Sequence, residues 1–387
     1  VCERLLGEGE GSDMGHVAEI LQVLKDESLV AKDLHQSLDD VRTLRAGMGR
    51  TQGDATESLK RLALQASKAN ALMRKRLMNL GAISVCERLL GEGDESDIDL
   101  VAVIVQALKE DSQVAQGLQQ TLDDVRIVKA TTGWLNNGEA CLQRDGTRLE
   151  ICKTSAEFAL LCRYFRRCLT SHRLRYHSRV RCSPPLVKIE SIHRLRPSSD
   201  IEKLYRLELE QLKRKHSERG GCEQARLSVA LRRKMEDGVP NLNEALLWHG
   251  CPGRAVIDRI LKDGFDTRFA GASTGCSFGQ GVYFAEHSSK SDLYAKPDEH
   301  GVRRMLLAVV CLGQPFYATK TTEDFSMPPC MGCSLEIRKK CTCTKKGNTF
   351  DSISALTKDG GGIVDFPEHV VFTNFRVVLV AEIAYKH

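Results

Sequence analysis

Apolar residues in the first third of the chain recur with the period of an α-helix. Leu100, Val101, Ile104, Val105 and Leu108 stand at i, i+1, i+4, i+5 and i+8, which places them on one helical face. Residues 186–192 instead alternate between apolar and polar side chains, a pattern typical of a strand with one buried face. The pattern therefore predicts a helical N-terminal region and a C-terminal region that contains strands.

The helical region contains an internal repeat. Residues 1–42 and 85–126 agree at about two-thirds of their positions, at an offset of 84 residues (85 − 1). Units of roughly 40 residues are typical of armadillo or HEAT repeats, which stack into a solenoid because no unit buries its apolar face alone. We predict an all-α repeat solenoid over residues 1–129, with further repeats before Val1 because the first unit starts partway through. The solenoid could be a passive scaffold, or its surface could bind a protein partner; the sequence allows both.

Residues 130–184 are predicted to form a basic connector or a small subdomain. No acidic residue lies between Glu157 and Glu190, and seven arginines fall between Arg163 and Arg181, together with Tyr164, Phe165 and Tyr176. Arginines pair with phosphates and aromatic rings stack on bases, so this segment is a candidate for binding nucleic acid or another polyanion. The alternative is a solvated, charged face.

Composition narrows the class of protein. The chain has 387 residues, 15 cysteines and a formal net charge of +5, which is modest for its length. It has no run of 18 apolar residues, and Glu3, Arg4 and Glu8 do not fit a secretory signal, so we expect no membrane association. The cysteines are scattered, which fits reduced thiols and an intracellular location, nuclear or cytoplasmic.

The C-terminal domain is predicted to span residues 185–387. Pro197 ends the alternating strand, and Ser199 with Glu202 has the spacing of a helix capping box. A strand and then a helix thus open this domain. The whole chain is therefore expected to be multidomain.

Four blocks of this region carry the candidate chemistry: Leu247-Trp248-His249-Gly250, Gly279-Gln280-Gly281-Val282-Tyr283-Phe284-Ala285, Ser288-Ser289-Lys290-Ser291-Asp292-Leu293-Tyr294 and Pro367-Glu368-His369-Val370-Val371-Phe372. A lone histidine in an apolar run is more often a core residue than a catalytic one. In this order and spacing, however, the blocks resemble the catalytic domain of the poly(ADP-ribose) polymerase (PARP) family. The resemblance covers roughly residues 185–387 and implies an α+β ADP-ribosyltransferase fold with NAD+ as substrate.

The resemblance also implies how NAD+ would be held. Gly250 would grip the nicotinamide carboxamide through its backbone, where a side chain would prevent close approach. Ser291 would donate a hydrogen bond to the carboxamide oxygen. Tyr283 and Tyr294 would stack on the two faces of the nicotinamide ring. Outside this context, the two tyrosines would be read as ordinary core aromatics.

Glu368, His249 and Tyr283 are the catalytic residues that the resemblance implies. His249 would bond the adenosine ribose, and Arg268 would lie on the adenine side of NAD+. Glu368 would contact the nicotinamide ribose and orient the acceptor; the alternative is an exposed residue at a strand edge. Members with this glutamate can form polymer, whereas His369 replaces the aromatic residue that usually follows it. Mono- and poly-ADP-ribosylation both stay open.

Four cysteines near the C-terminus offer the thiolates that tetrahedral zinc requires: Cys330, Cys333, Cys341 and Cys343. Two interpretations follow: the four cysteines form a structural zinc site, or they are surface thiols without a ligand. Tankyrases, which belong to the PARP family, hold zinc in the loop before the strand that corresponds to residues 306–310, so their site does not transfer to these cysteines.

The sequence thus predicts an NAD+-dependent ADP-ribosyltransferase whose acceptors are proteins, itself included. Poly(ADP-ribose) joins nucleic acid as a candidate ligand of the segment from Arg163 to Arg181. The alternative, from another functional class, is an inactive module that binds NAD+ or ADP-ribose and is presented on the helical repeats. Release of nicotinamide separates the two.

Overall fold

The computed structural model divides the chain into two compact units, residues 1–125 and residues 126–387. We describe each unit by itself. The structure describes residues 58–64, 66, 74, 77–78, 82–83, 85–86, 95–108, 113–136, 148–169, 172–173, 181–182, 187–217, 221–233, 241–267, 276–335, 341, 343 and 348–386.

The described residues of the first unit are helical. They include α6 (Glu95–Leu108) and the first part of α7 (Gln113–Asn136). Val101, Ile104, Val105 and Leu108 are buried together, as their spacing predicts, whereas Leu100 is only partly buried. Residues 1–57, which hold one copy of the repeat, lie outside the described residues. The helices described before residue 125 do not show a solenoid, so the armadillo or HEAT array remains a prediction.

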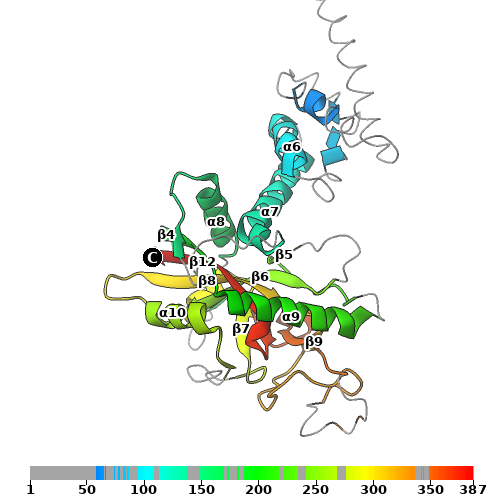
Figure 1. The fold of residues 1–387 in the computed structure, drawn as a ribbon, viewed down its shortest axis with the longest axis vertical. Coiled ribbons are helices and arrows are strands. Elements are labelled where there is room, and N and C mark those ends of the chain that lie inside the picture. Colours follow the sequence, from blue (N-terminus) through cyan, green and yellow to red (C-terminus); the bar gives the residue numbers. More distant parts are fainter. Residues whose placement is uncertain are drawn as a thin grey trace, which may run out of the picture. The chain divides into compact units, whose positions relative to one another are not determined.

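The second unit is built on a mixed sheet that has ten strands among the described residues (Figure 1). Its neighbours are antiparallel except for one parallel pair, β9 and β10. A short strand, β5 (Leu231–Arg232), pairs with β6 beside the main path, and β2 (His172–Arg173) pairs with β3 (Arg181–Cys182) in a separate sheet. The main order is β1 (Arg148–Glu150), β4 (Lys188–Leu195), β12 (Val377–Lys386), β8 (Arg303–Cys311), β6 (Glu244–Cys251), β7 (Val282–Ala285), β11 (Glu368–Val371), β10 (Ser352–Ala355) and β9 (Pro315–Ala318).

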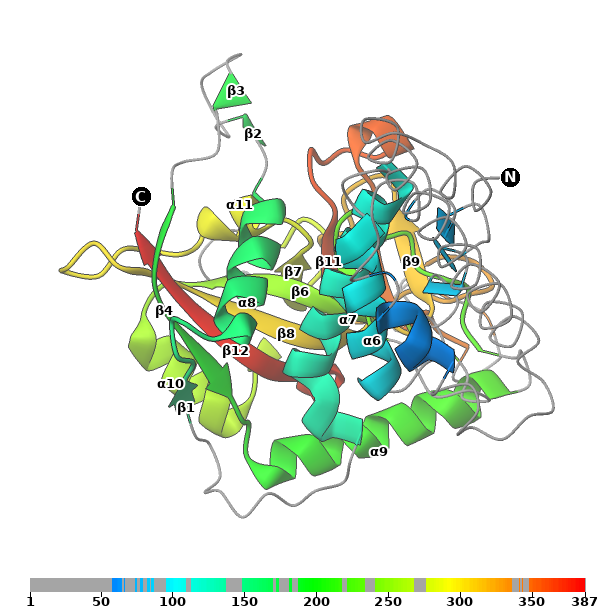
Figure 2. The ribbon, with the colours of Figure 1, turned by 90° about the horizontal axis from the view of Figure 1, so that it is seen from above.

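Helices cover both faces of the sheet. On β6, Leu246 and Trp248 point to one face, where they join a core that includes α8 (Ala156–Arg167) and α9 (Ser199–His216). Leu247 points to the other face, where α10 (Arg254–Asp263) packs. Figure 2 shows α8 across the central strands. Short elements complete the unit: α11 (Ser288–Asp292) and the 3₁₀ turns η3 (Lys358–Gly360) and η4 (Asn374–Arg376).

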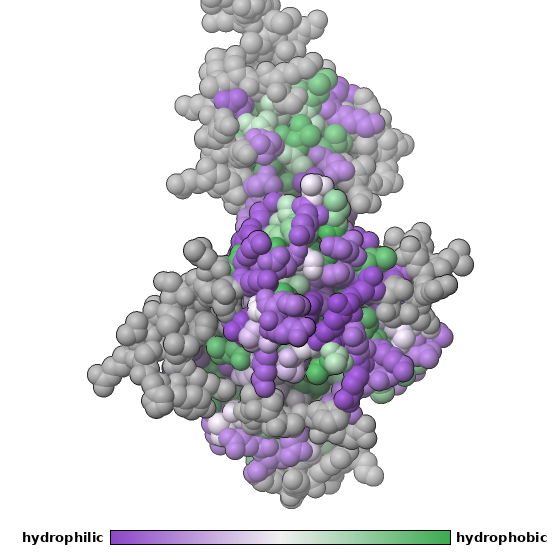
Figure 3. All heavy atoms as spheres, turned by 90° about the vertical axis from the view of Figure 1, so that its left-hand side faces the viewer, coloured by the Kyte–Doolittle hydropathy of each residue, from purple (hydrophilic) through white to green (hydrophobic). Residues whose placement is uncertain are grey.

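The central strands are mostly apolar because both of their faces are covered. Every residue of β12 from Val377 to Tyr385 is buried, and so are the residues of β8 from Met305 to Cys311. Large apolar residues at the surface, such as Leu149, Leu204 and Val256, are scattered, and hydrophilic side chains prevail among the coloured residues at the centre of Figure 3. Scattered exposed apolar residues are ordinary for a folded protein.

Two boundary predictions can be compared with the structure. The predicted strand over residues 186–192 corresponds to β4, which runs from Lys188 to Leu195. The N-cap of α9 is Ser198 rather than Ser199: Ser198 has extended backbone angles, and its hydroxyl accepts a hydrogen bond from the amide of Ile201. The capping-box prediction was therefore one residue too late. None of the described helices has both the length and the hydropathy of a membrane span.

Candidate active site

Strand pairing brings three of the four predicted blocks side by side. β7, which carries Tyr283, pairs with β6 on one side and with β11 on the other. Ala285 is opposite Trp248 on β6 and opposite Glu368 on β11. The fourth block forms α11 directly after β7. Residues separated by about 120 positions therefore meet on three neighbouring strands inside the sheet.

Gly250 lies against the turn that follows α11. A β-carbon at this position would clash with the carbonyl oxygen of Ser291 and would lie 3.1 Å from Cβ of Tyr294. The backbone of β6 therefore touches the segment that carries both residues, and only glycine fits. The Ser291 hydroxyl is buried and donates a 3.0 Å hydrogen bond to the carbonyl oxygen of Trp248. This contact fixes Ser291 beside Gly250.

His249 is partly buried among aromatic rings. Its ring lies 5.0 Å from that of Phe265 and 5.5 Å from that of Phe284, measured between centroids. Its Nδ1 lies 2.9 Å from the carbonyl oxygen of Tyr283, so Nδ1 carries the proton and donates. Burial lowers the pKa of His249 below its ordinary value of 6.5 and outweighs that hydrogen bond. The imidazole is thus neutral at pH 7, and Nε2 is left as an acceptor.

The hydroxyl of Tyr283 is held by the glycine-rich segment just before its strand. It accepts a 2.8 Å hydrogen bond from the amide of Phe278 and donates a 2.9 Å hydrogen bond to the carbonyl oxygen of Gly279. Burial, with a smaller contribution from the Glu368 carboxylate, raises the pKa of Tyr283 above its usual 10. The phenol therefore stays protonated and its ring is fixed in one orientation.

Lys290 links the carboxylate of Glu368 on β11 to the ring of Tyr294, which follows α11. The sequence did not predict this role of Lys290. Its Nζ lies 2.9 Å from Oε1 of Glu368, and both side chains are nearly buried. The same ammonium lies 5.6 Å from the ring centroid of Tyr294. Glu368 is therefore a buried, paired carboxylate and not an exposed strand-edge residue. The block Ser288 to Tyr294 contained Lys290, but nothing local in that block pointed to its partner.

A second buried network lies behind the carboxylate. His369, next to Glu368 on β11, is buried; its Nε2 donates to Oε1 of Glu286 over 3.1 Å, and Nδ1 lies 2.8 Å from the hydroxyl of Ser354. Neighbouring residues of a strand point to opposite faces, so His369 does not enter the site that Glu368 faces. Glu286 Oε2 also accepts from the amides of Ser228 and Val229. Burial opposes its ionisation, but these donors outweigh burial and lower the pKa of Glu286 to about 2.

Two further predictions concern Arg268 and the arginine-rich segment from Arg163 to Arg181. Arg268 lies outside the described residues. In the arginine-rich segment, Tyr164 and Phe165 are buried on α8, and their rings contact Trp248 at 5.3 and 5.4 Å between centroids. These two rings are core residues and do not serve to stack on bases. Arg163 and Arg166 are exposed, so binding of nucleic acid or poly(ADP-ribose) by this segment remains a prediction.

Two groups of side chains among the described residues have metal-ligand chemistry. The sulfur atoms of Cys330, Cys333, Cys341 and Cys343 lie within 4.8 Å of one another and could hold zinc. The second group is His216, Cys222 and Asp351. There, however, the Asp351 carboxylate already pairs with Lys215 at 2.6 Å and with His216 at 2.7 Å, so its charge is satisfied by the protein.

Comparison with known proteins agrees with the geometry. Residues 189–374 match the family model of the poly(ADP-ribose) polymerase catalytic domain. Protein mono-ADP-ribosyltransferase PARP3 of Gallus gallus is 37% identical over 84 residues, which are 22% of this chain and 15% of that protein. Poly [ADP-ribose] polymerase tankyrase of Caenorhabditis elegans is 31% identical over 175 residues, 40% of this chain and 7% of that protein.

A third relative, protein mono-ADP-ribosyltransferase PARP12 of Mus musculus, is 28% identical over 145 residues, 37% of this chain and 18% of that protein. The matches to these three relatives thus span less than a fifth of each relative's length. They include proteins named for mono- and for poly-ADP-ribosylation. The strand pairing and the family match lead to one conclusion: residues 189–374 are a PARP-family ADP-ribosyltransferase domain.

Proposed function

We propose that this protein transfers ADP-ribose from NAD+ to protein acceptors, itself included, and releases nicotinamide. Glu368, His249 and Tyr283 are the proposed catalytic residues, and Gly250, Ser291, Tyr294 and Arg268 complete the proposed NAD+ site. The observation that carries the proposal is the position of the Lys290 ammonium, which pairs with Glu368 and lies over the ring of Tyr294. Lys290 thus brings the Glu368 carboxylate and the Tyr294 ring together, and Cβ of Tyr294 lies close to Gly250.

These groups suit the cleavage of the bond between nicotinamide and ribose. As that bond breaks, its electron pair leaves with nicotinamide and positive charge develops on the ribose, as in glycoside cleavage. A preorganised carboxylate such as Glu368 stabilises the developing charge. The acceptor nucleophile then forms a new bond to the same ribose carbon and gives up its proton, for which the Glu368 carboxylate is the proposed acceptor. Lys290 would hold this carboxylate in position.

The leaving group is held by different residues. The backbone of Gly250 is the proposed partner of the planar carboxamide, and the close contact of Gly250 with the carbonyl of Ser291 holds Ser291 and Tyr294 beside it. Tyr283 and Tyr294 provide the aromatic faces, and stacking adds on the order of 1 kcal/mol to area burial. Ser291 already donates to the carbonyl oxygen of Trp248, so a bond to the carboxamide requires its hydroxyl to rotate.

His249 is proposed to bind the adenosine ribose through Nε2. The Nδ1 proton is bonded to the carbonyl oxygen of Tyr283, and the lowered pKa keeps the ring neutral. Neutral Nε2 accepts a hydrogen bond from a ribose hydroxyl, which a protonated ring could not do. Because the pKa of His249 is lowered, its protonation and the resulting loss of NAD+ binding should occur only at a pH below 6.5, the ordinary pKa of histidine.

The experiment is incubation of the full chain with NAD+ that carries a label in its adenosine half. The proposal expects label that stays on protein after denaturation, together with an equal amount of free nicotinamide. NAD+ that binds without covalent label or nicotinamide release would instead support an inactive binding module. Mass spectrometry of the labelled protein then gives the acceptor residue and the number of ADP-ribose units, which decides between mono- and poly-ADP-ribosylation.

A further inference from the structure

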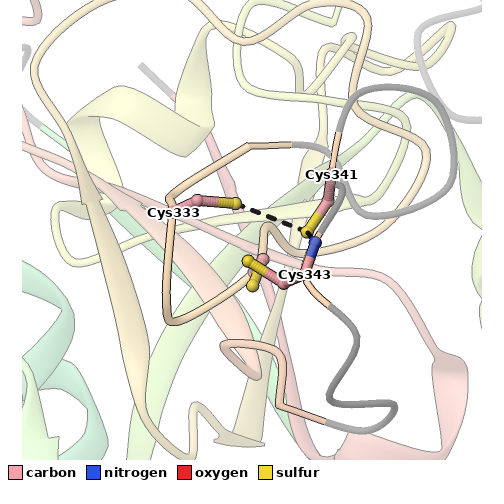
Figure 4. A group of neighbouring side chains, drawn as sticks. Cys333, Cys341 and Cys343 are labelled. Atoms are coloured by element: carbon pink, nitrogen blue, oxygen red, sulfur yellow. Dashed lines mark hydrogen bonds between the residues drawn. The ribbon is translucent and has the colours of Figure 1, made fainter.

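The connection between β9 and β10, residues 319–351, contains a cluster of thiols that the proposed reaction does not use. The four sulfur atoms of Cys330, Cys333, Cys341 and Cys343 lie within 4.8 Å of one another. Figure 4 shows the side chains of Cys333 and Cys341 pointing toward each other, with 3.4 Å between their sulfurs. Four sulfurs around one zinc ion, each about 2.3 Å from it, lie about 3.8 Å apart. The cluster is close to that size.

The backbone around the cluster supports bound thiolates. The amide of Gly332 donates to the sulfur of Cys330, and the amide of Cys343 donates to that of Cys341, each over 3.3 Å. Such donors stabilise a sulfur that carries negative charge. A β-carbon on Gly332 would lie 3.6 and 3.7 Å from the sulfurs of Cys343 and Cys330, so the chain wraps closely around them.

The turn that carries the first two cysteines is closed by its own hydrogen bonds. The amide of Cys330 donates to the carbonyl oxygen of Leu335 over 2.9 Å, and that of Ser334 donates to the carbonyl oxygen of Cys330 over 2.8 Å. Ser334 adopts a left-handed backbone with a φ of 57°, which few residues other than glycine do without a compensating contact. The turn thus holds Cys330 and Cys333 in fixed positions.

We propose that these four cysteines bind one Zn²⁺ ion as a structural site. Binding removes one proton from each thiol, so Zn²⁺ and four thiols give a tetrathiolate with a net charge of −2 and four released protons. The same stretch of sequence contains five cationic residues: Arg338, Lys339, Lys340, Lys345 and Lys346. Four protein ligands leave no position for water or substrate, which makes the site structural and not catalytic.

The site would stabilise the connection that borders the proposed NAD+ site. Within this connection, the amide of Thr322 donates to the carbonyl oxygen of Ser277 over 2.8 Å, and the carbonyl oxygen of Phe325 accepts from the amide of Gln280 over 2.7 Å. Residues 277–280 in turn hold the hydroxyl of Tyr283. Loss of zinc would therefore loosen the support of that ring, a consequence that rests on the proposed function.

The test begins with metal analysis of the full chain, purified with a reducing agent, supplied with Zn²⁺ alone and then dialysed without chelator. We expect one zinc per chain, and loss of that zinc in the Cys333→Ser/Cys341→Ser double variant. Cys152→Ser is the matched control, because Cys152 is exposed and lies outside the cluster. Zinc below about one-tenth of an ion per wild-type chain, or zinc retained equally by the double variant, would overturn the proposal.

Two further measurements keep the result clear if the double variant folds poorly. Wild-type protein in which Co²⁺ replaces zinc should show the absorption bands of a tetrahedral thiolate complex, which a weak surface ion lacks. After denaturation without reductant and removal of metal, all 15 cysteines should react with a thiol reagent. Eleven reactive thiols (15 − 4) would mean two disulfides and no zinc site.

The effect of zinc on NAD+ turnover and on stability is measured separately from zinc binding. Removal of zinc from the wild-type protein should raise the KM for NAD+ at least about threefold and lower the thermal midpoint by roughly 5 °C or more. If the protein releases no nicotinamide at all, the proposed function fails, while the zinc count and the cobalt spectrum still decide the metal site. If zinc is bound but its removal changes neither KM nor thermal midpoint, the structural role is wrong.

Discussion

The ammonium of Lys290 lies 2.9 Å from Oε1 of Glu368, and the two side chains are only 10% and 12% exposed. The pair joins α11 to β11, two elements separated by 78 positions in the chain (368 − 290). A carboxylate this well buried would be costly to ionise without a counter-charge. Lys290 therefore supplies the counter-charge of Glu368 and fixes its carboxylate at the place where the nicotinamide ribose is proposed to lie.

Replacement of Lys290 by Met is the first prediction. It leaves Glu368 buried without its partner, which costs about 3–5 kcal/mol when a buried pair is broken. We expect kcat for nicotinamide release to fall at least about tenfold, and Lys290→Arg to recover part of the loss because it restores the charge. Lys358→Met is the control, since Lys358 pairs with Asp365 at the surface. Equal rates in the two methionine variants would contradict this role of Lys290.

Gly250 gives a second prediction with an internal control three residues away. Alanine at position 250 would clash with the carbonyl oxygen of Ser291, whereas a β-carbon at Gly253 meets nothing within 4 Å. Gly250→Ala should lower the free energy of unfolding by about 1–3 kcal/mol, as over-packing does, and should raise the dissociation constant for NAD+. Gly253→Ala should change both within about 1 kcal/mol. Urea denaturation and calorimetric titration of NAD+ measure the two effects; tight NAD+ binding by Gly250→Ala would contradict the proposed backbone contact.

The Glu286 network gives a third prediction, about stability. Glu286→Gln replaces one carboxylate oxygen with an amide group that donates, although the neighbours Ser228, Val229 and His369 all donate toward this side chain. At least one donor is left without an acceptor, which costs about 1–3 kcal/mol. The thermal midpoint should fall by roughly 3–10 °C. Glu299→Gln changes an exposed side chain and should leave the midpoint unchanged; an equal midpoint in the two variants would show that the network adds no stability.

Stability in acid gives a fourth prediction, centred on Asp351. Burial opposes ionisation of its carboxyl group, but the hydrogen bond with His216 and the charges of Arg376 and Lys215 outweigh burial and lower its pKa to about 2, from an ordinary 3.8. A lowered folded-state pKa stabilises the protein above pH 3.8, and this stability is lost as pH falls from about 4 to 2. The contribution at neutral pH is about 2 kcal/mol.

The Asp351→Asn variant checks this pH dependence. It should be less stable than wild type at pH 7, and the difference in unfolding free energy should shrink as pH is lowered from 4 to 2. Denaturation curves at pH 7, 4 and 3 measure it. Glu286 also has a pKa near 2 and contributes in the same direction in both proteins, so it cancels in the comparison. A difference that stays constant with pH would mean that the Asp351 charge is not the cause.

Local sequence patterns predicted several helices and strands. Most contacts that they did not predict join residues that are far apart in the sequence. The strand at residues 186–192 and the helical stripe from Val101 to Leu108 were readable because their periods are local. The family resemblance located His249, Tyr283 and Glu368 in the chain, but the pairing of β7 with both β6 and β11 depends on residues far apart in sequence. The link from Lys290 to Glu368 is of the same long-range kind.

The helical spacing of the apolar residues in α8 shows which of its aromatic residues belong to the core. Tyr164 and Phe165 stand among arginines and look like surface aromatics, yet with Leu160 and Leu161 they occur at i, i+1, i+4 and i+5 and form one buried face. The charged residues around them occupy the other face. The segment before residue 185 therefore contributes to the core beside the sheet, and experiments on the domain should keep residues 126–184.

Nicotinamide release from NAD+ by the full chain tests the central claim most directly. We expect release by the wild-type protein and release at least about tenfold slower in Glu368→Ala and His249→Ala, because each variant loses at least about 1.4 kcal/mol of transition-state stabilisation. Lys358→Met should match wild type. Release at the wild-type rate in both site variants, or NAD+ bound by the wild-type protein without any release, would contradict the account.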